Sequence, residues 1–463
     1  MAETSIKFCG AAGEVTGSRH LLNTPGGTLL MDCGLFQGHR RESLEKNKKF
    51  LFEPEKLGAA LLSHAHIDHS GALPLLVSKG YGGRIYSTAI TSELSQIMLM
   101  DSARLQDADA RFFNKIHASE GLRIDPLYTE EDAKKALSLF SPREFRAEFS
   151  PLEGVKVSFL NSGHVLGSSM IGVETGGLKI LYTGDIGRRE QLMLKEPDIP
   201  ENADYLVMET TYGNKDHENA SDAGQVLGEL IKEAVKNRSK ILIPGFSLER
   251  TQEVIYMIDK LTHNREIPKI PVYVDSPMSV NVTRVFNKHI NETNFNPGFM
   301  GYSEKDGDPF GYDYIRYLST KEESQTLNDK KGPMVIISAS GMCEGGRILH
   351  HIRNLVGNDN DTLLIVGYQA EGTLGRRLKD GAKEIRIFGM KHNVYFRVKT
   401  IDFLSAHAGM SDLLSYVKAV NPKKGIFLVH GEEPQRANFA GLLKKEGYEK
   451  VFIPALGEEF RLE

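Results

Sequence analysis

The chain has 463 residues, of which 40% are hydrophobic and 25% are charged, and this is the composition of a soluble protein with enough apolar residues for several domain cores. Its formal net charge of −4 excludes a polycationic nucleic-acid binder, so any contact with nucleic acid must be local. The absence of a signal-like N-terminal region, the lack of any apolar run of about 18 residues, and the presence of only three cysteines predict a cytoplasmic protein with reduced thiols and no membrane partner.

The first two hundred residues alternate short β-branched or aliphatic runs with glycine-rich turns, which is typical of strands. Between these runs lie segments rich in alanine, leucine, methionine and charged residues, without glycine or proline, which favours helices. We therefore predict a mixed α/β domain with strands at 27–31, 59–62, 155–159 and 178–182 and helices at 91–111 and 130–139.

From about Glu209 the pattern changes to apolar strands followed by helices, and this alternation predicts a parallel sheet covered by helices. Apolar residues at helical spacing predict a helix at 247–261. The polar segment 291–331 is expected to be a long surface excursion. Ten basic and six acidic residues make the window 340–400 locally positive. The predicted strands are 240–244, 271–274, 334–337, 362–366 and 385–388.

Metal-ligand residue types are concentrated directly after the predicted strand 59–62. The segment 63–69 reads SHAHIDH and places three imidazoles and a carboxylate at the mouth of one strand. His64 and His66 point the same way in extended chain, whereas Asp68 and His69 fall past the bend, so two adjacent metal positions result. Imidazole and carboxylate are the non-thiol ligands that zinc prefers. The alternative is a solvated polar loop. However, placing four polar residues within six positions directly after a buried strand costs free energy unless they have partners, so this alternative is disfavoured.

Single ligand candidates follow other predicted strands. His164 and Asp185 each stand beside glycines, which permit close backbone approach. Each alone is as readily a surface histidine or a turn aspartate, but the nearby cluster makes metal ligation the preferred interpretation of both. Asp32 follows the strand at 27–31 in the same way, and we predict that it orients ligands by hydrogen bonds.

These segments resemble the metallo-β-lactamase superfamily, whose HxHxDH signature is complete at 64–69. The segments VMETTYG, FLSAHAG and LVHGE, which begin at residues 207, 403 and 428, are similar to three motifs of its nucleic-acid-processing branch, the β-CASP proteins. That branch includes the cleavage-and-polyadenylation endonuclease and bacterial and archaeal ribonucleases. The resemblance implies an αββα sandwich at 1–208 and 398–463, interrupted by a β-CASP domain on a mostly parallel sheet at 209–397.

The resemblance also implies a site that holds two zinc ions per chain. A histidine at position 430 is what the RNA-cleaving members have, so the implied substrate is single-stranded RNA. The implied ligands are His64, His66 and His164 for one zinc and Asp68, His69 and His430 for the other, with Asp185 as the bridge.

A catalytic mechanism follows from the same resemblance. A hydroxide shared by two metals would attack phosphorus, and Asp68 and Asp185 count with the catalytic residues. His407, oriented by Glu209, would protonate the leaving oxygen as general acid. Position 409 holds glycine where the family usually has an acidic residue. This difference affects the hydrogen bonding expected in that turn, but it does not affect the imidazole of His407.

Candidate substrate contacts lie in the second half of the chain. Residues 337–347 place hydroxyl groups, small residues and backbone amides beside a guanidinium, which suits them to hold a phosphate. A glycine-rich turn after a strand is the alternative, and the resemblance favours an RNA-backbone clamp. Segments 245–250 and 372–377 also place arginine beside a glycine turn, although Arg250 is as readily a helix-surface charge. The predicted contacts are Ser247, Arg250, Ser338, Ser340, Gly341, Met342, Gly346, Arg347, Gly375 and Arg376.

Zinc-dependent hydrolysis of RNA is therefore the function that we predict. A hydrolase of thioesters, lactones or lactams is the second hypothesis, but an insertion of about 190 residues is needless for a small substrate. A catalytically silent RNA-binding scaffold is the third, and seven competent ligand positions argue against it. The choice between endonuclease and 5′-3′ exonuclease action, and between monomer and homodimer, stays open.

Overall fold

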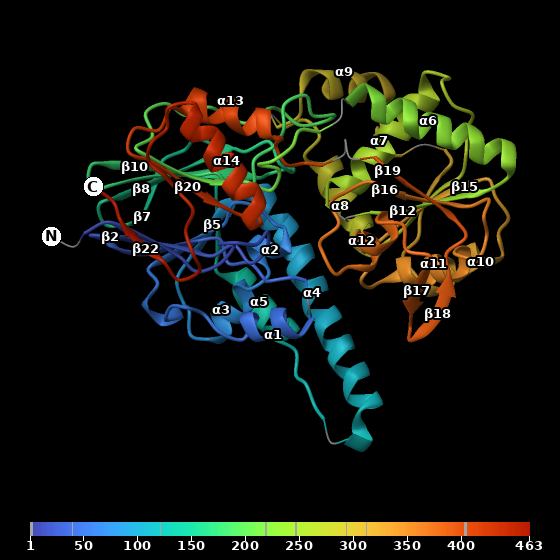
Figure 1. The fold of residues 1–463 in the computed structure, drawn as a ribbon, viewed down its shortest axis with the longest axis horizontal. Coiled ribbons are helices and arrows are strands. Elements are labelled where there is room, and N and C mark those ends of the chain that lie inside the picture. The colour runs from blue at the N-terminus through green and yellow to red at the C-terminus, as the bar shows by residue number, and fades with distance from the viewer. Residues whose placement is uncertain are drawn as a thin grey trace. The chain divides into compact units, whose positions relative to one another are not determined.

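The computed structural model describes residues 3–38, 40–120, 122–217, 220–245, 248–292, 294–311, 313–401 and 405–463. The chain forms two compact units, shown in Figure 1. Unit 1 comprises 1–189, 195–216 and 406–463, and unit 2 comprises 190–194 and 217–405. The second unit is thus an insertion within the first. The sequence-based limits of 209 and 397 for the inserted domain stay a prediction.

Unit 1 contains two seven-stranded mixed sheets. The first sheet has the order β22 (Glu459–Arg461), β1 (Ser5–Phe8), β2 (His20–Thr24), β3 (Gly27–Met31), β4 (Ala59–Leu61), β5 (Ile85–Thr88) and β6 (Phe140–Arg143). The second has the order β21 (Val451–Phe452), β20 (Gly425–Val429), β11 (Tyr205–Glu209), β10 (Leu178–Tyr182), β9 (Ser169–Thr175), β8 (Val155–Asn161) and β7 (Phe149–Leu152). Pairing is parallel from β3 to β6 and from β10 to β21. All other pairs of these two sheets are antiparallel.

Helices cover the outer face of each sheet in unit 1. The helices are α1 (Arg40–Asn47), α2 (Ile67–Ser70), α3 (Leu73–Ser78), α4 (Ala89–Ile116), α5 (Glu130–Ser138), α13 (Met410–Val420) and α14 (Glu433–Lys445), with single 3₁₀ turns at Pro54–Lys56 and Ala118–Glu120. One core lies between the sheets, because alternate strand residues such as Ile6, Phe8 and Phe159 are apolar and point inward. A second core joins the first sheet to α3, α4 and α5, and a third joins the second sheet to α13 and α14. The implied αββα layering is confirmed.

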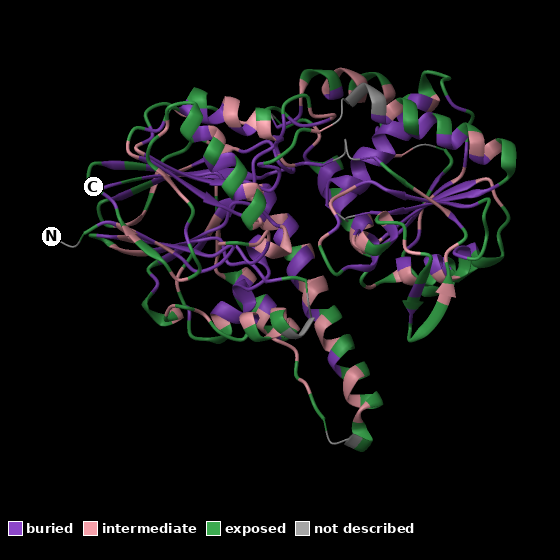
Figure 2. Ribbon diagram, in the orientation of Figure 1, coloured by how far each residue is buried: buried purple, intermediate pink, exposed green. Residues whose placement is uncertain are grey.

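Unit 2 contains a six-stranded sheet in which every pair is parallel, in agreement with the predicted parallel sheet. Its order is β14 (Ile315–Tyr317), β13 (Val272–Asp275), β15 (Met334–Ser338), β12 (Lys240–Pro244), β16 (Thr362–Ile365) and β19 (Arg397–Thr400). Figure 2 shows this sheet buried between helices with exposed outer faces. The helices are α6 (Ala220–Asn237), α7 (Arg250–His263), α8 (Pro277–Lys288), α9 (Pro297–Asp306), α10 (Lys321–Asp329), α11 (Arg347–Leu355) and α12 (Leu374–Lys379).

Two sequence-based assignments in unit 2 are wrong. The segment 291–331 is not a surface excursion, because α9, β14 and α10 fall within it and β14 joins the sheet beside β13. Its polar composition hid three buried aromatic side chains, Phe295, Phe299 and Phe310. The predicted strand 385–388 also does not join the parallel sheet. It pairs instead with β18 (Met390–Asn393) as β17 (Glu384–Ile387), forming a separate antiparallel hairpin.

The predicted helix at 91–111 is longer in the structure. Helix α4 runs from Ala89 to Ile116, with the side chain of Thr88 accepting a hydrogen bond from the Thr91 amide at its start. Within the described part of the chain, no helix has both the length and the apolar character needed to cross a bilayer.

Candidate metal and catalytic site

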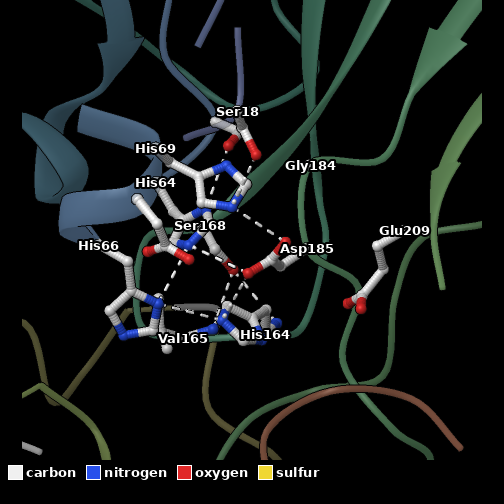
Figure 3. Close-up of polar contacts among 12 residues, drawn as sticks. Ser18, His64, His66, His69, His164, Val165, Ser168, Gly184, Asp185 and Glu209 are labelled. Carbon is white, nitrogen blue, oxygen red and sulfur yellow. Dashed lines mark hydrogen bonds and ion pairs between the residues drawn. The ribbon is translucent and has the colours of Figure 1, made fainter. Parts of the chain in front are cut away.

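The candidate ligands gather where strands of unit 1 end. The carboxyl ends of adjacent parallel strands lie at one edge of a sheet, and the loops that follow them can therefore share a site. The histidine rings surround the carboxylate of Asp185 (Figure 3). The contributing segments are the β4–α2 connection with His64 and His66, helix α2 with Asp68 and His69, the β8–β9 turn with His164, and the loops after β10 and β20 with Asp185 and His430.

A first group contains three imidazoles and one carboxylate. Nδ1 of His66 lies 3.1 Å from Nε2 of His64 and 3.2 Å from Nε2 of His164. Oδ2 of Asp185 lies 3.5 Å from Nε2 of His64 and 3.4 Å from Nε2 of His164. The structure thus brings together the four residues that were predicted to share one zinc.

A second group lies on the other side of Asp185. Its Oδ1 atom is 3.1 Å from Nε2 of His69 and 3.6 Å from Nδ1 of His430. Nε2 of His430 is 3.5 Å from Oδ2 of Asp68. One ligand atom each from Asp68, His69 and His430 lies within 4.8 Å of the others. Asp185 therefore contacts both groups, as a bridging ligand must.

Hydrogen bonds to Asp32 fix two of the imidazole rings. Oδ2 of Asp32 lies 2.7 Å from Nδ1 of His69 and accepts hydrogen bonds of 2.7 Å from Ser63 Oγ and Tyr182 OH. Since the Ser63 hydroxyl hydrogen is used there, Nδ1 of His64, 3.0 Å from Oγ, must be the donor in that contact. Nδ1 is thereby engaged in both rings, which leaves Nε2, the atom that faces Asp185, as the nitrogen available to a metal.

This arrangement fits metal ions better than it fits an empty polar cluster. Nε2 of His64 and the carboxylate of Asp185 are both acceptors, and His66 Nδ1 has at most one hydrogen to share between His64 and His164. The Nε2 atom of His430 is buried and makes no hydrogen bond to any residue that the structure describes. Buried acceptors that face one another without donors are unfavourable unless a cation lies among them. The residues therefore fit the two zinc ions that the resemblance implied.

The ionisation of three of the histidines agrees with metal binding, whereas His69 must lose a proton to bind a metal. Burial lowers the pKa of His64 and of His164, and it lowers the pKa of His66 to about 4. These three rings are therefore neutral near pH 7, which is the form that binds metal. Burial also lowers the pKa of His69, but Asp185 and Asp32 outweigh it and raise that pKa well above its ordinary value.

His407 lies beside the metal ligands and is held by Glu209. Its Nδ1 atom is 2.9 Å from Oε1 and 3.0 Å from Oε2 of Glu209, and 3.9 Å from Oδ2 of Asp185. The buried Glu209 carboxylate is fixed in turn by the amides of Ile186 and Thr211. Although burial lowers the pKa of His407, Glu209 and Asp185 raise it to about 9. These carboxylates thus favour the protonated form of the ring, which is the form that a general acid requires.

Two site residues adopt a left-handed backbone conformation that is uncommon outside glycine. Asp32 has a φ of 57° and His430 a φ of 47°. Such conformations cluster at functional sites, where the surrounding structure enforces them. The Gly34 backbone is equally constrained, because a Cβ there would meet the carbonyl oxygen of Asp68 at 1.6 Å. The chain is therefore tightly fitted around the ligand segment.

Three residues that make hydrogen bonds in the site were not predicted from the sequence. Ser63 and Tyr182 donate to Asp32, and Thr211 donates to Glu209. Their only sequence signals were position: Ser63 and Tyr182 stand next to predicted strand ends, and Thr211 lies two residues after Glu209.

The polar groups of the predicted phosphate-binding turn in unit 2 make hydrogen bonds to the protein itself. Arg347 donates to Asp275 Oδ1 at 2.7 Å and to the carbonyl oxygens of Leu318 and Ser319 at 3.2 and 2.8 Å. Ser338 Oγ donates to the carbonyl of Asp275. Within the turn, Ser340 Oγ accepts from the amides of residues 344 and 345, and Gly346 is the N-cap residue of α11. The phosphate clamp itself stays a prediction.

The other predicted substrate contacts are also engaged with the protein. The carbonyl oxygens of Gly341 and Met342 accept hydrogen bonds from Gln369 and Gly375 respectively. Arg376 pairs with Asp380 one turn later on the surface. Arg250 is buried and pairs with Glu253, so it is not a helix-surface charge. Ser247 lies outside the described residues.

Family models match the chain in three segments. They are the Metallo-beta-lactamase superfamily at 13–243, the Beta-Casp domain at 251–378 and the Zn-dependent metallo-hydrolase RNA specificity domain at 391–454. Ribonuclease TTHA0252 of Thermus thermophilus is 34% identical over 449 residues, which cover 97% of this chain and 98% of that protein. The chain belongs to the β-CASP branch of the metallo-β-lactamase superfamily.

Other relatives of this β-CASP protein come from archaea. An RNase J-like protein of Methanocaldococcus jannaschii is 32% identical over 456 residues, covering 98% of each chain. Transcription termination factor FttA of Methanosarcina mazei is 29% identical over 460 residues, covering 95% of this chain and 69% of that protein. A crystal structure of a protein of unknown function from Enterococcus faecalis V583 shares the fold, with a TM-score of 0.56, 14% identity and full coverage of both chains.

Proposed function

We propose that the chain is a zinc-dependent ribonuclease that hydrolyses phosphodiester bonds of single-stranded RNA. The observation that carries the proposal is the convergence of six ligand-type side chains around a seventh, Asp185, with the His407–Glu209 pair beside them. His64, His66 and His164 would hold one zinc, Asp68, His69 and His430 the other, and Asp185 both. Zinc ions bound there would supply an activated water near neutral pH and neutralise charge on the phosphate.

The residues of the chain perform the remaining steps. Asp32 and Ser63 keep His69 and His64 in the tautomer and orientation that ligation needs. Glu209 holds Nδ1 of His407, so the proton for the leaving 3′ oxygen is carried on Nε2. The products are then a 5′-phosphate and a 3′-hydroxyl.

RNA is the proposed substrate because three observations agree on it. His430 lies in the site and contacts Asp68. The relatives are named as a ribonuclease and an RNase J-like protein. A segment that matches an RNA specificity domain covers residues 391–454, from the end of unit 2 into the last part of unit 1. We also propose that the domains run 1–208, 209–397 and 398–463, and that the turn at 338–347 and Arg376 contact the RNA backbone.

Metal analysis and a labelled RNA test this proposal together. Protein purified without chelator should contain about two zinc ions per chain and should cleave an RNA labelled at its 5′ end, with activity lost on chelation and restored by zinc. The product ladder separates internal cleavage from stepwise removal of 5′ nucleotides, and light scattering tests for a homodimer. Zinc-free protein that cleaves RNA would contradict the mechanism. Rapid turnover of a small ester without RNA cleavage would contradict the substrate.

A further inference from the structure

The hairpin of β17 and β18 in unit 2 has an unusual residue at its tip. Ile387 pairs with Met390, which leaves Phe388 and Gly389 as a two-residue loop. Both loop residues have positive φ, 50° for Phe388 and 79° for Gly389. This is the pattern of a type I′ turn, whose first position favours asparagine, aspartate or glycine. A bulky aromatic residue with positive φ is a genuine outlier.

Packing does not explain the presence of this phenylalanine. The Phe388 side chain is 51% exposed, so it contributes little to a core. Its ring centroid lies 4.7 Å from that of His350, and the Arg353 guanidinium lies 5.7 Å from it. Met390, the first residue of β18, and Tyr395, two residues after β18 ends, are also exposed, at 53% and 59%. The hairpin therefore presents large apolar side chains that are about half exposed to solvent.

The same hairpin places positive charges opposite each other. Arg386 and Lys391 are directly paired across the strands, and like charges in that position destabilise a hairpin. Lys391 is offset by Glu384, 3.0 Å away, whereas Arg386 makes no ion pair among the described residues. Lys383 is exposed beside them. Burial, Arg353 and other nearby positive groups lower the pKa of His350. An anion bound beside Arg386 and Lys391 would relieve the repulsion between these two side chains.

We propose that the β17–β18 hairpin is a stacking platform for single-stranded RNA, with a base on the ring of Phe388 and the adjoining phosphates on Arg386 and Lys391. The assignment rests on the proposed ribonuclease function and adds a substrate contact to it. Exposed rings interleaved with basic side chains are the combination that binds flexible single strands, because every base has a face that can stack. A purely apolar docking partner would leave Arg386 and Lys391 unmatched.

Phe388→Asn is a sharp test because its effects on folding and on RNA binding are opposite. It creates the Asn-Gly sequence that type I′ turns prefer, so the full-length variant should be at least as stable as the parent. Its affinity for a fluorescein-labelled oligouridine, measured on ice with the probe checked for integrity, should fall roughly 5- to 100-fold, the usual effect of losing one stacked base. Phe112→Ala, at a ring 66% exposed on α4, is the control and should change neither quantity.

A second probe separates stacking from charge. An oligomer of abasic ribose phosphates has the same charges and no bases, so the parent should bind it more weakly than oligouridine, and Phe388→Asn should remove most of that difference. Arg386→Thr should make oligouridine binding less sensitive to salt. The slope of log K against log salt concentration should become less steep by up to ~0.7. Lys305→Gln is its control, because α9 lies at the far side of unit 2 from the hairpin (Figure 1).

The outcomes distinguish this proposal from the ribonuclease function. If the parent cleaves RNA and both hairpin variants bind it like the parent, the platform is wrong and the enzyme assignment stands. If those variants instead lose self-association in light scattering, the surface belongs to a second copy of the chain. If the parent neither binds nor cleaves RNA, the proposed function fails first. Should Phe388→Asn prove less stable than the parent, Arg386→Thr alone decides the matter.

Discussion

The Oδ2 atom of Asp32 lies 2.7 Å from Nδ1 of His69, in a side-chain pair that is fully buried. The same oxygen also accepts from Ser63 and Tyr182. Three donors on one carboxylate oxygen fix that oxygen in place, and the His69 ring is thereby held with Nε2 toward Asp185. The ligand geometry therefore depends on a residue that does not itself belong to either ligand group.

Asp32→Asn should weaken zinc binding by about 10- to 100-fold, the usual effect of losing such a supporting hydrogen bond. The amide nitrogen cannot accept the hydrogen bonds that Oδ2 receives, so the His69 ring loses its anchor. Zinc affinity measured by competition with a chromophoric chelator checks this. Tyr182→Phe removes only one of the three donors and should have a smaller effect. Parent-like zinc affinity in Asp32→Asn would show that the ring is oriented by other contacts.

His407→Ala should retain zinc while RNA cleavage slows by ~10²- to 10⁴-fold, because the lost group protonates the leaving oxygen. The loss should appear in kcat rather than in KM. His263→Ala is a matched control, since His263 also lies near a carboxylate, Asp306 at 3.5 Å, but is 54% exposed in unit 2. Loss of zinc together with activity would make His407 a ligand or a structural support instead.

The candidate ligands could be predicted from sequence because histidine and aspartate after predicted strands are chemically informative and because strand ends converge. Ser63 and Tyr182 could not be predicted as site residues, since serine and tyrosine occur throughout the chain and only the three-dimensional structure brings them to Asp32. For Arg347, the local sequence suggested a ligand but could not reveal the residue's partner within the protein. Its glycine-rich neighbourhood suggested a phosphate, but its nearest carboxylate, Asp275, is 72 residues away in sequence.

The fold could be predicted where the hydrophobic pattern was regular. The parallel strands of unit 2 have continuous apolar runs, and those runs identified most of them. The segment 291–331 could not be assigned, because single aromatic residues such as Phe295 and Phe310 form its core amid polar residues. The hairpin strand β17 resembles a sheet strand locally, and only pairing shows its partner.

Arg347→Ala should lower the free energy of unfolding by about 1.5–3 kcal/mol, because it removes a charge-assisted hydrogen bond to the fully buried Asp275. Urea denaturation checks this. Arg376→Ala, which breaks an exposed pair with Asp380, should change stability by less than about 1 kcal/mol. If Arg347 also contacts phosphate, as predicted, Arg347→Ala should make the slope of log K for RNA binding against log salt concentration less steep by up to ~0.7. An unchanged salt dependence would leave Arg347 with a structural role alone.

Asp259→Asn should stabilise unit 2 at high pH and not at low pH. Asp259 on α7 is 5% exposed, and Tyr302 on α9 donates a 2.6 Å hydrogen bond to its Oδ2 atom. Burial raises the pKa of Asp259 to about 6, a rise that Asp306 and Asp308 support and that Tyr302 and His263 oppose.

Because the folded pKa of about 6 lies above the ordinary value of 3.8, the stability that is fully present below pH 3.8 is lost as the pH rises from there to about 6. Above that range the buried carboxyl group is ionised in both states and the loss is complete. Asparagine cannot ionise and still accepts the Tyr302 hydrogen bond. Its advantage should therefore be near zero below about pH 3.8 and grow to ~1–3 kcal/mol by about pH 7, where the loss is complete. Urea denaturation at both pH values measures it. Asp313→Asn, at a side chain 86% exposed, is the control and should show no such change. A stability difference that is the same at both pH values would show that Asp259 is not ionising in the folded state over this range.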